Sequence, residues 1–71
     1  MAPLSPDDLS LLKDALDIKL RKEDLEHALG RALRNRGLEY DRYITITSGV
    51  RAARHKDEST EACARRLISE G

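Results

Sequence analysis

Apolar residues between positions 25 and 33 recur with a helical period. Leu25, Ala28, Leu29, Ala32 and Leu33 fall at i, i+3, i+4, i+7 and i+8, the spacing of a one-sided apolar stripe on an α-helix. No other stretch of the chain has so regular a stripe. Burial of the three leucines would contribute about 5–9 kcal/mol before opposing effects. We therefore expect this helix to form the central wall of the core.

An earlier helix has a clear start signal. Ser5 suits the N-cap, Pro6 suits the first helical position, and Asp8 completes a capping box in which Asp replaces the usual Glu. The apolar period is interrupted at residues 17–21, so we expect the helix to end there in a short connection. A single long helix is the alternative, because neither Gly nor Pro marks the break.

The helix that carries the leucine stripe is expected to begin near Arg21 or Lys22. It should end at Arg36, with Gly37 in the left-handed conformation that stops many helices. Gly30 lies inside this helix, where it costs about 1 kcal/mol relative to Ala. Either another backbone approaches Gly30 closely, or the cost is tolerated without a function.

Residues 38–56 allow two interpretations. The run Tyr-Ile-Thr-Ile-Thr at 43–47 is rich in β-branched residues and alternates, which is typical of a strand. A Ser-Gly pair follows and could turn the chain back, giving a small hairpin with residues 50–55. The alternative places a short helix at 38–43 and starts another after Ser48. We favour an extended segment at 43–47 and assign no structure to 50–55.

The last helix is expected to begin near Asp57 or Ser59, because either residue can cap it. Its apolar positions lie within residues 63–68. Together these elements predict a mainly α fold in a single domain over residues 1–71. The expected architecture is a small bundle of three to four helices, with a short β segment or hairpin allowed within residues 43–55.

The composition limits the core. The chain has 71 residues, of which 37% are charged, and it contains no Trp and no Phe. A core of Leu, Ile, Val and Ala has little volume per residue, so we expect modest stability or a partner that completes the core. Residues 1–30 carry seven acids and four bases, whereas residues 31–71 carry six acids and nine bases. This asymmetry suits association with an acidic partner or between copies of the chain.

Cysteine use and hydropathy bear on the compartment. Cys63 is the only cysteine, which excludes an intrachain disulfide and fits a reducing compartment. No apolar run approaches the length of about 18 residues that a membrane-spanning helix needs, and no leader of the secretory type is evident. We therefore expect a cytoplasmic protein that does not insert into a membrane.

The sequence contains no catalytic or metal-binding motif. His27, His55 and Cys63 lack the spacing of a zinc site. The four glycines are too far apart to form a phosphate-binding loop. Cys63 lies between alanines, and such a cysteine is more typical of a core than of a nucleophile. We expect a protein that is not an enzyme and that uses no metal and no cofactor.

The best candidate for function is a basic stretch near the end of the uncertain region. The predicted partner-binding residues are Arg42, Tyr43, Arg51, Arg54, His55 and Lys56. Aromatic residues concentrate at interface hot spots, which makes the tyrosine a natural anchor. These residues predict a non-catalytic protein–protein interaction module of adaptor or regulatory type. The expected partner is another protein with an acidic surface, or a second copy in a homo-oligomer.

Two other interpretations remain open for this segment. Residues 42–56 could contact the DNA backbone in a small transcriptional regulator of helix-turn-helix or winged type. The neutral net charge counts against such a regulator, since DNA-binding domains are usually basic. Alternatively, the basic residues are simply a solvated surface beside Asp57, Glu58 and Glu61.

Overall fold

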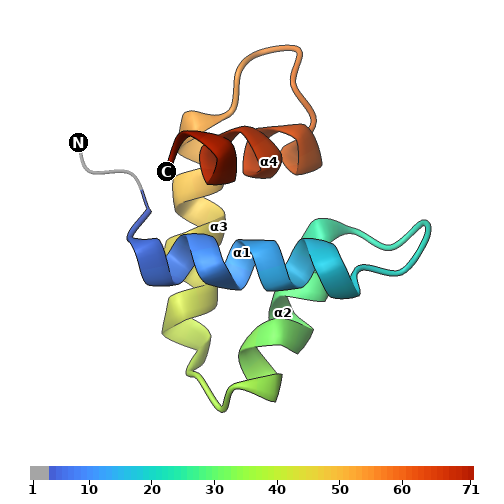
Figure 1. The fold of residues 1–71 in the computed structure, drawn as a ribbon, viewed down its shortest axis with the longest axis vertical. Helices are drawn as coiled ribbons and strands as arrows, with labels where there is room; N and C mark the ends of the chain where they lie inside the picture. The colour runs from blue at the N-terminus through green and yellow to red at the C-terminus, as the bar shows by residue number, and fades with distance from the viewer. Residues whose placement is uncertain (1–3) are drawn as a thin grey trace.

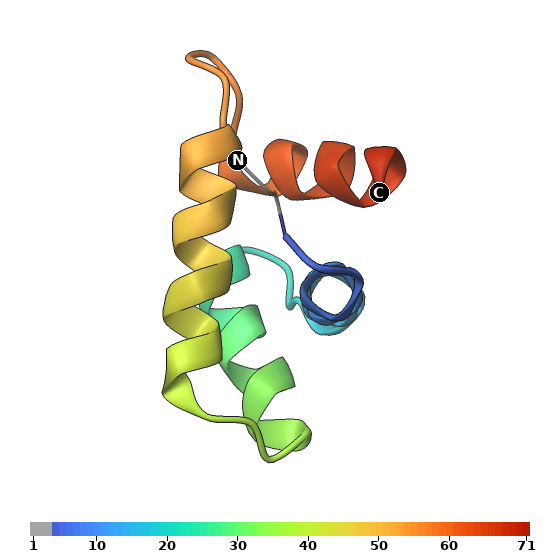
Figure 2. The same ribbon diagram turned by 90° about the vertical axis from the view of Figure 1, so that its left-hand side faces the viewer.

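The computed structural model describes residues 4–71, and it contains four α-helices. They are α1 (Pro6–Ile18), α2 (Leu25–Asn35), α3 (Tyr40–Ala53) and α4 (Thr60–Glu70). No strand occurs within residues 4–71, so the mainly helical fold class is confirmed. α1 crosses in front of α3 in Figure 1, and the turned view of Figure 2 shows α3 along one edge of the molecule with the other three helices on the same side of it.

The start of α1 is the capping box that the sequence predicts. The Ser5 hydroxyl accepts a hydrogen bond from the backbone N–H of Asp8 at 3.2 Å, and the Asp8 carboxylate accepts one from the N–H of Ser5 at 3.3 Å. Pro6 occupies the first helical position. These bonds satisfy N–H groups that the first turn of a helix leaves without partners. α1 ends at Ile18, which confirms the predicted break before α2.

α2 begins at Leu25, a few residues later than predicted, and it ends as predicted just before Gly37. The φ angle of Gly37 is +67°. The N–H of Leu38 donates to the carbonyl of Leu33 at 3.0 Å, and the N–H of Gly37 donates to the carbonyl of Arg34 at 3.0 Å. These two bonds form a Schellman motif, which ends the helix and leads the chain into α3 through a short connection.

The prediction of an extended segment at residues 43–47 is wrong, because residues 40–53 form one continuous helix. The alternative of two helices with a break at Ser48 is wrong for the same reason. Ile46 and Val50 lie about one helical turn apart and are only 0% and 3% exposed. The packing of these two side chains into the core overrides the β propensity of the segment.

α4 follows Ser59, whose hydroxyl accepts a hydrogen bond from the N–H of Ala62 at 3.1 Å, as predicted for a cap. The buried apolar residues come from all four helices: Leu11, Leu12, Ala15, Leu25, Ala28, Leu29, Ala32, Leu33, Ile46, Val50, Cys63, Ala64 and Leu67. All five positions of the predicted stripe on α2 are among them, which confirms that the stripe is buried in the core. Within the described residues, no helix combines the length and the apolar character needed to cross a bilayer.

Among residues 4–71, Gly30 has no close backbone neighbour outside its own helix. A Cβ atom at Gly30 would meet only the guanidinium of Arg34, at 3.7 Å, which is an ordinary van der Waals contact. Close approach therefore does not explain this glycine. Gly30 instead borders the groove between α2 and α3 that is described below.

Truncation of the central leucine tests the core. Leu29→Ala is expected to lower the free energy of unfolding by about 2–5 kcal/mol, because the side chain is 1% exposed and its removal leaves a cavity. Leu20→Ala is the matched control, since Leu20 is 62% exposed and its truncation should change stability by no more than about 0.5 kcal/mol. Urea unfolding followed by circular dichroism measures both, and equal effects of the two changes would contradict the assigned core.

Candidate docking surface on α3

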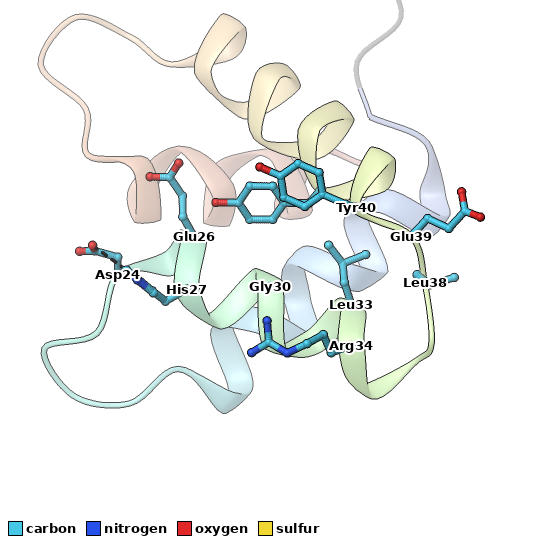
Figure 3. A pocket seen from close by; sticks show the side chains of 10 residues that line it. Asp24, Glu26, His27, Gly30, Leu33, Arg34, Leu38, Glu39 and Tyr40 are labelled. Carbon is cyan, nitrogen blue, oxygen red and sulfur yellow. Dashed lines mark ion pairs between the residues drawn. The ribbon is translucent and has the colours of Figure 1, made fainter.

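A groove of about 510 Å³ lies between α2 and the start of α3 (Figure 3). Its lining residues come from α2 and its cap, from the connection and from the first turn of α3: Asp24, Glu26, His27, Gly30, Leu33, Arg34, Leu38, Glu39, Tyr40 and Tyr43. The groove exists because the Schellman turn at Gly37 places α3 beside α2 at an angle (Figure 1).

Two stacked tyrosines form the aromatic part of the groove. The rings of Tyr40 and Tyr43 have centroids 5.3 Å apart and planes only 15° from parallel. Tyr43 is half-buried against the core, and its burial, with the nearby carboxylate of Glu26, raises the pKa of its phenol. Tyr40 is 70% exposed. The pair therefore leaves much of the Tyr40 ring open to a partner, while Tyr43 holds the stack in place.

The charges around the groove are mostly negative. The carboxylates of Asp24 and Glu26 lie toward one end and Glu39 toward the other, with Tyr40 between them (Figure 3). In the described part of the chain, Arg34 is the only Lys or Arg side chain that lines the groove. His27 Nδ1 lies 3.6 Å from the carboxylate of Asp24, on an exposed surface. An aromatic surface between carboxylates favours a cationic group of a partner.

The solvent side of α3 is uncharged along its middle. We call the exposed positions Asp41, Ile44, Thr45, Ser48 and Ala52 the outer stripe, because they recur with the helical period opposite the buried residues. Ile44 is 46% exposed, and α3 carries no charged residue from position 43 to position 50. The other helices lie on the far side of α3, so this stripe is open along its length (Figure 2).

The structure divides the predicted partner-binding residues between the two ends of α3. Arg42 and Tyr43 lie in its first turn, whereas Arg51, Arg54, His55 and Lys56 lie at or beyond its last turn. Seven residues of helix, 44–50, lie between Tyr43 and Arg51, so the two sets are about 12 Å apart along the helix axis. The six residues therefore do not form one basic cluster, and each end of α3 has to be considered by itself.

Several of the predicted basic residues already have partners within the chain. Arg42 forms an ion pair with Asp8 at 2.8 Å, and the Asp8 side chain is largely buried. Arg51 lies 3.5 Å from Glu26, and both of these side chains are exposed. Exposed pairs contribute little to stability and exchange readily with water or other charges. Arg51 therefore remains available to a partner, whereas Arg42 serves mainly to fix α3 against α1.

The segment after α3 is held by a carboxylate that accepts several hydrogen bonds. The guanidinium of Arg66 donates to both oxygens of Glu58, at 2.9 and 3.0 Å, and also to the carbonyl of Ala53 at 2.7 Å. The N–H of His55 donates to Glu58 at 3.1 Å, and Arg54 donates to the Glu58 carbonyl at 2.6 Å. Hydrogen bonds from Arg66 and His55 hold the pKa of Glu58 at about 2. This network positions the basic end of α3.

Cys63, the candidate nucleophile, does not line the groove. Cys63 is buried, its thiol lies 3.4 Å from the carbonyl of Val50, and burial raises its pKa. A covered thiol with a raised pKa is a weak nucleophile at neutral pH. Within residues 4–71 no three of the His, Cys, Asp and Glu side chains gather where they could hold a metal ion.

Comparison of the chain with known protein families, with curated proteins and with solved structures finds no match. Neither Ile44 nor the acidic border of the groove is among the partner-binding residues that the sequence predicts. The helical period could have revealed Ile44, because it falls opposite Ile46 and Val50 once residues 40–53 are placed on one helix.

Removal of the Glu58 carboxylate tests the network that positions the basic end. The pKa of Glu58 falls from an ordinary 4.5 to about 2 on folding, so its ionised form stabilises the folded state above pH 4.5. This contribution is lost as the pH falls through the range from 4.5 to 2. Glu58→Gln should therefore be less stable than the wild type at neutral pH, and the difference should shrink in acid.

Urea unfolding at a series of pH values measures this effect. Glu39→Gln is the control, because Glu39 is exposed and takes part in no ion pair within residues 4–71. Its stability at neutral pH should match that of the wild type. A difference between Glu58→Gln and the wild type that does not change with pH would contradict the role given to the ionised carboxylate.

Proposed function

We propose that this protein is a non-catalytic protein–protein interaction module that docks through α3. One observation carries the proposal: α3 presents Tyr40 and Ile44 to solvent beside a groove, on a side of the molecule that no other helix covers (Figure 2). Large exposed apolar side chains that lie together mark binding surfaces more often than scattered ones do.

The energetics favour docking at this surface. Ile44 is 46% exposed, so covering the rest of its side chain would contribute about 1 kcal/mol before the cost of association, and the Tyr40 ring would add further apolar area. Aromatic anchors beside a groove are typical hot spots of interfaces. The outer stripe has no charge to desolvate in its middle, and the charged groups lie at its ends, where they affect orientation and association rate.

The basic end of α3 supports an acidic partner. Arg51 is exposed and only loosely paired, and Lys56 is exposed beyond the helix. Opposite charges on a partner protein would steer it to this end of α3 and fix its direction along the helix. The proposed role is therefore that of an adaptor or regulatory module, in which binding itself is the activity.

A substitution on the outer stripe tests the proposal. Ile44→Glu places a charge in the middle of the stripe without disturbing the core, since Ile44 is already half exposed. The tagged variant and the wild type are used to capture proteins from an extract of the source organism, followed by quantitative mass spectrometry. Proteins held by the wild type should be lost from Ile44→Glu.

Lys13→Glu on the exposed side of α1 is the matched control, and it should retain the same proteins as the wild type. Circular dichroism verifies that both variants are folded. Capture of the same proteins by the wild type and by Ile44→Glu would remove α3 as the docking surface.

A DNA-binding regulator is the second candidate, because the α2–turn–α3 unit has a short connection that contains Gly37 and leaves α3 exposed. In helix-turn-helix proteins the first residues of the second helix contact base edges. Here that position carries Glu39 and Asp41, which repel phosphates, and Arg42 is engaged by Asp8. These charges favour the interaction module.

Fluorescence anisotropy with a labelled random-sequence duplex separates the two candidates. We expect no binding at low salt, because the start of α3 is acidic. Binding that weakens steeply as salt is added would indicate phosphate contacts and would replace the interaction module with the regulator. Arg51→Ala should then reduce the salt dependence, whereas Lys13→Ala on α1 should not.

A further inference from the structure

We propose that the outer stripe of α3 binds the outer stripe of a second copy of this chain, with the two helices antiparallel about a two-fold axis. This inference rests on the proposed use of α3 as a docking surface and specifies its occupant. The observation that carries it is the order of unpaired or loosely paired charges along α3: acidic at the start, uncharged in the middle and basic at the end. Arg42, the one base in the first turn, is paired with Asp8 on α1.

The charges at the two ends are complementary only in one arrangement. Glu39 and Asp41 lie at the start of α3, and Arg51, Arg54 and Lys56 lie at its end. When two such helices run antiparallel, each acidic end faces the basic end of the other copy. A parallel pair would place acids beside acids and bases beside bases, which costs free energy. The helix dipoles also favour the antiparallel pair.

The middle of the stripe suits the contact between two helices. Ile44, Thr45 and Ser48 are exposed, uncharged and mostly small, so two helices could approach to an axial distance of about 8–10 Å. A two-fold axis near position 46 places Asp41 of one copy opposite Arg51 of the other, and it does so twice in the dimer. Such an isologous contact closes on itself and leaves no free end for further growth.

In the same antiparallel arrangement, residues of the second copy bind at the groove of the first. The basic end of the second α3 lies near the Tyr40 ring of the first, where the carboxylates of Asp24, Glu26 and Glu39 border the groove. A guanidinium stacks well on an exposed aromatic ring and is weakly hydrated. The groove, the outer stripe and the basic end of α3 thus become parts of one interface.

This contact accounts for the exposed side of α3 better than helix stability does. Solvent-exposed helix positions without a binding role are usually filled by strong helix formers such as Glu, Lys and Ala. The outer stripe instead carries Ile44, Thr45 and Ser48, which have lower helix propensity.

Sedimentation equilibrium over a range of concentrations tests the pairing. One copy has a mass of 8.0 kDa, and the weight-average mass should rise toward twice this value as concentration increases. A pair of single helices covers less than a standard interface, so we expect a dissociation constant on the order of 10–100 μM.

Charge reversal tests the direction of the helices. Asp41→Arg and Arg51→Asp should each weaken the dimer about tenfold or more, because each creates like-charge contacts at both ends. The double variant with both changes should recover the wild-type affinity to within about threefold, because the pairs are restored with exchanged signs. Lys13→Glu on α1 is the control and should dimerise as the wild type does. Circular dichroism verifies the fold of every variant.

Cross-linking provides a readout that does not depend on charge. In Ser48→Cys the new thiol lies close to the two-fold axis, so a short bismaleimide should link two copies. Lys13→Cys places the thiol on α1, away from the axis, and should not be linked. The native Cys63 is buried and should not react in the folded protein.

The outcomes separate this inference from the proposed function. A monomer at all concentrations would overturn the pairing, while capture of another protein through Ile44 would leave the docking function standing. A dimer with no recovery in the double variant, or with no cross-link at position 48, would place the contact elsewhere and would also overturn the pairing. Concentration-dependent dimers, recovery in the double variant and a cross-link at position 48 would support it.

Discussion

The fold depends on burying one side of α2 against α1 and α3. Leu25, Leu29 and Leu33 provide most of the apolar volume of α2, and the alanines between them are just as well covered. Because the chain has no Trp and no Phe, helices must approach closely to exclude water. Buried alanines such as Ala15 and Ala64 make this approach possible, since their small side chains let neighbouring backbones come near each other.

This mode of packing leaves α3 anchored by relatively few groups. Ile46 and Val50 are its only fully covered side chains, while Tyr43 and Ala53 are partly covered. The ion pair of Arg42 with Asp8 holds one end of α3, and the Arg66–Glu58 network holds the segment that follows the other end. The remaining side of α3 makes no contribution to the core, and its residues are therefore free to serve binding.

The parts of the fold that local interactions determine could be predicted from the sequence. The capping box at Ser5, the stop at Gly37 and the leucine stripe depend on residues within a few positions of each other, and the structure confirms all three. α3 could not be assigned in the same way. Ile44 and Ile46 are the same residue type, so residues 43–47 alternate between polar and apolar as a strand does. In the helix Ile46 is buried and Ile44 is exposed. Only contacts with distant parts of the chain decide which of the two is covered.

The candidate docking surface, too, could be predicted from the sequence only in part. The basic residues stand out in the sequence as a basic stretch, but the groups that they contact, in Asp8, Glu26 and Glu58, belong to α1, to α2 and to the loop before α4. Which charges are neutralised within the chain and which are left for a partner is a property of the tertiary structure. Asp8 lies 34 positions from Arg42, and Glu26 lies 25 positions from Arg51. No local sequence pattern reaches over such separations.

The tyrosine stack has a practical consequence for spectroscopy. Tyr40 and Tyr43 are the two tyrosines of a chain that has no Trp and no Phe, and both line the groove. The near-ultraviolet absorbance and the intrinsic emission of the whole protein therefore originate almost entirely from one place on its surface. A molecule that enters the groove changes that optical signal without any label, whereas one that binds to α4 leaves it nearly unaltered.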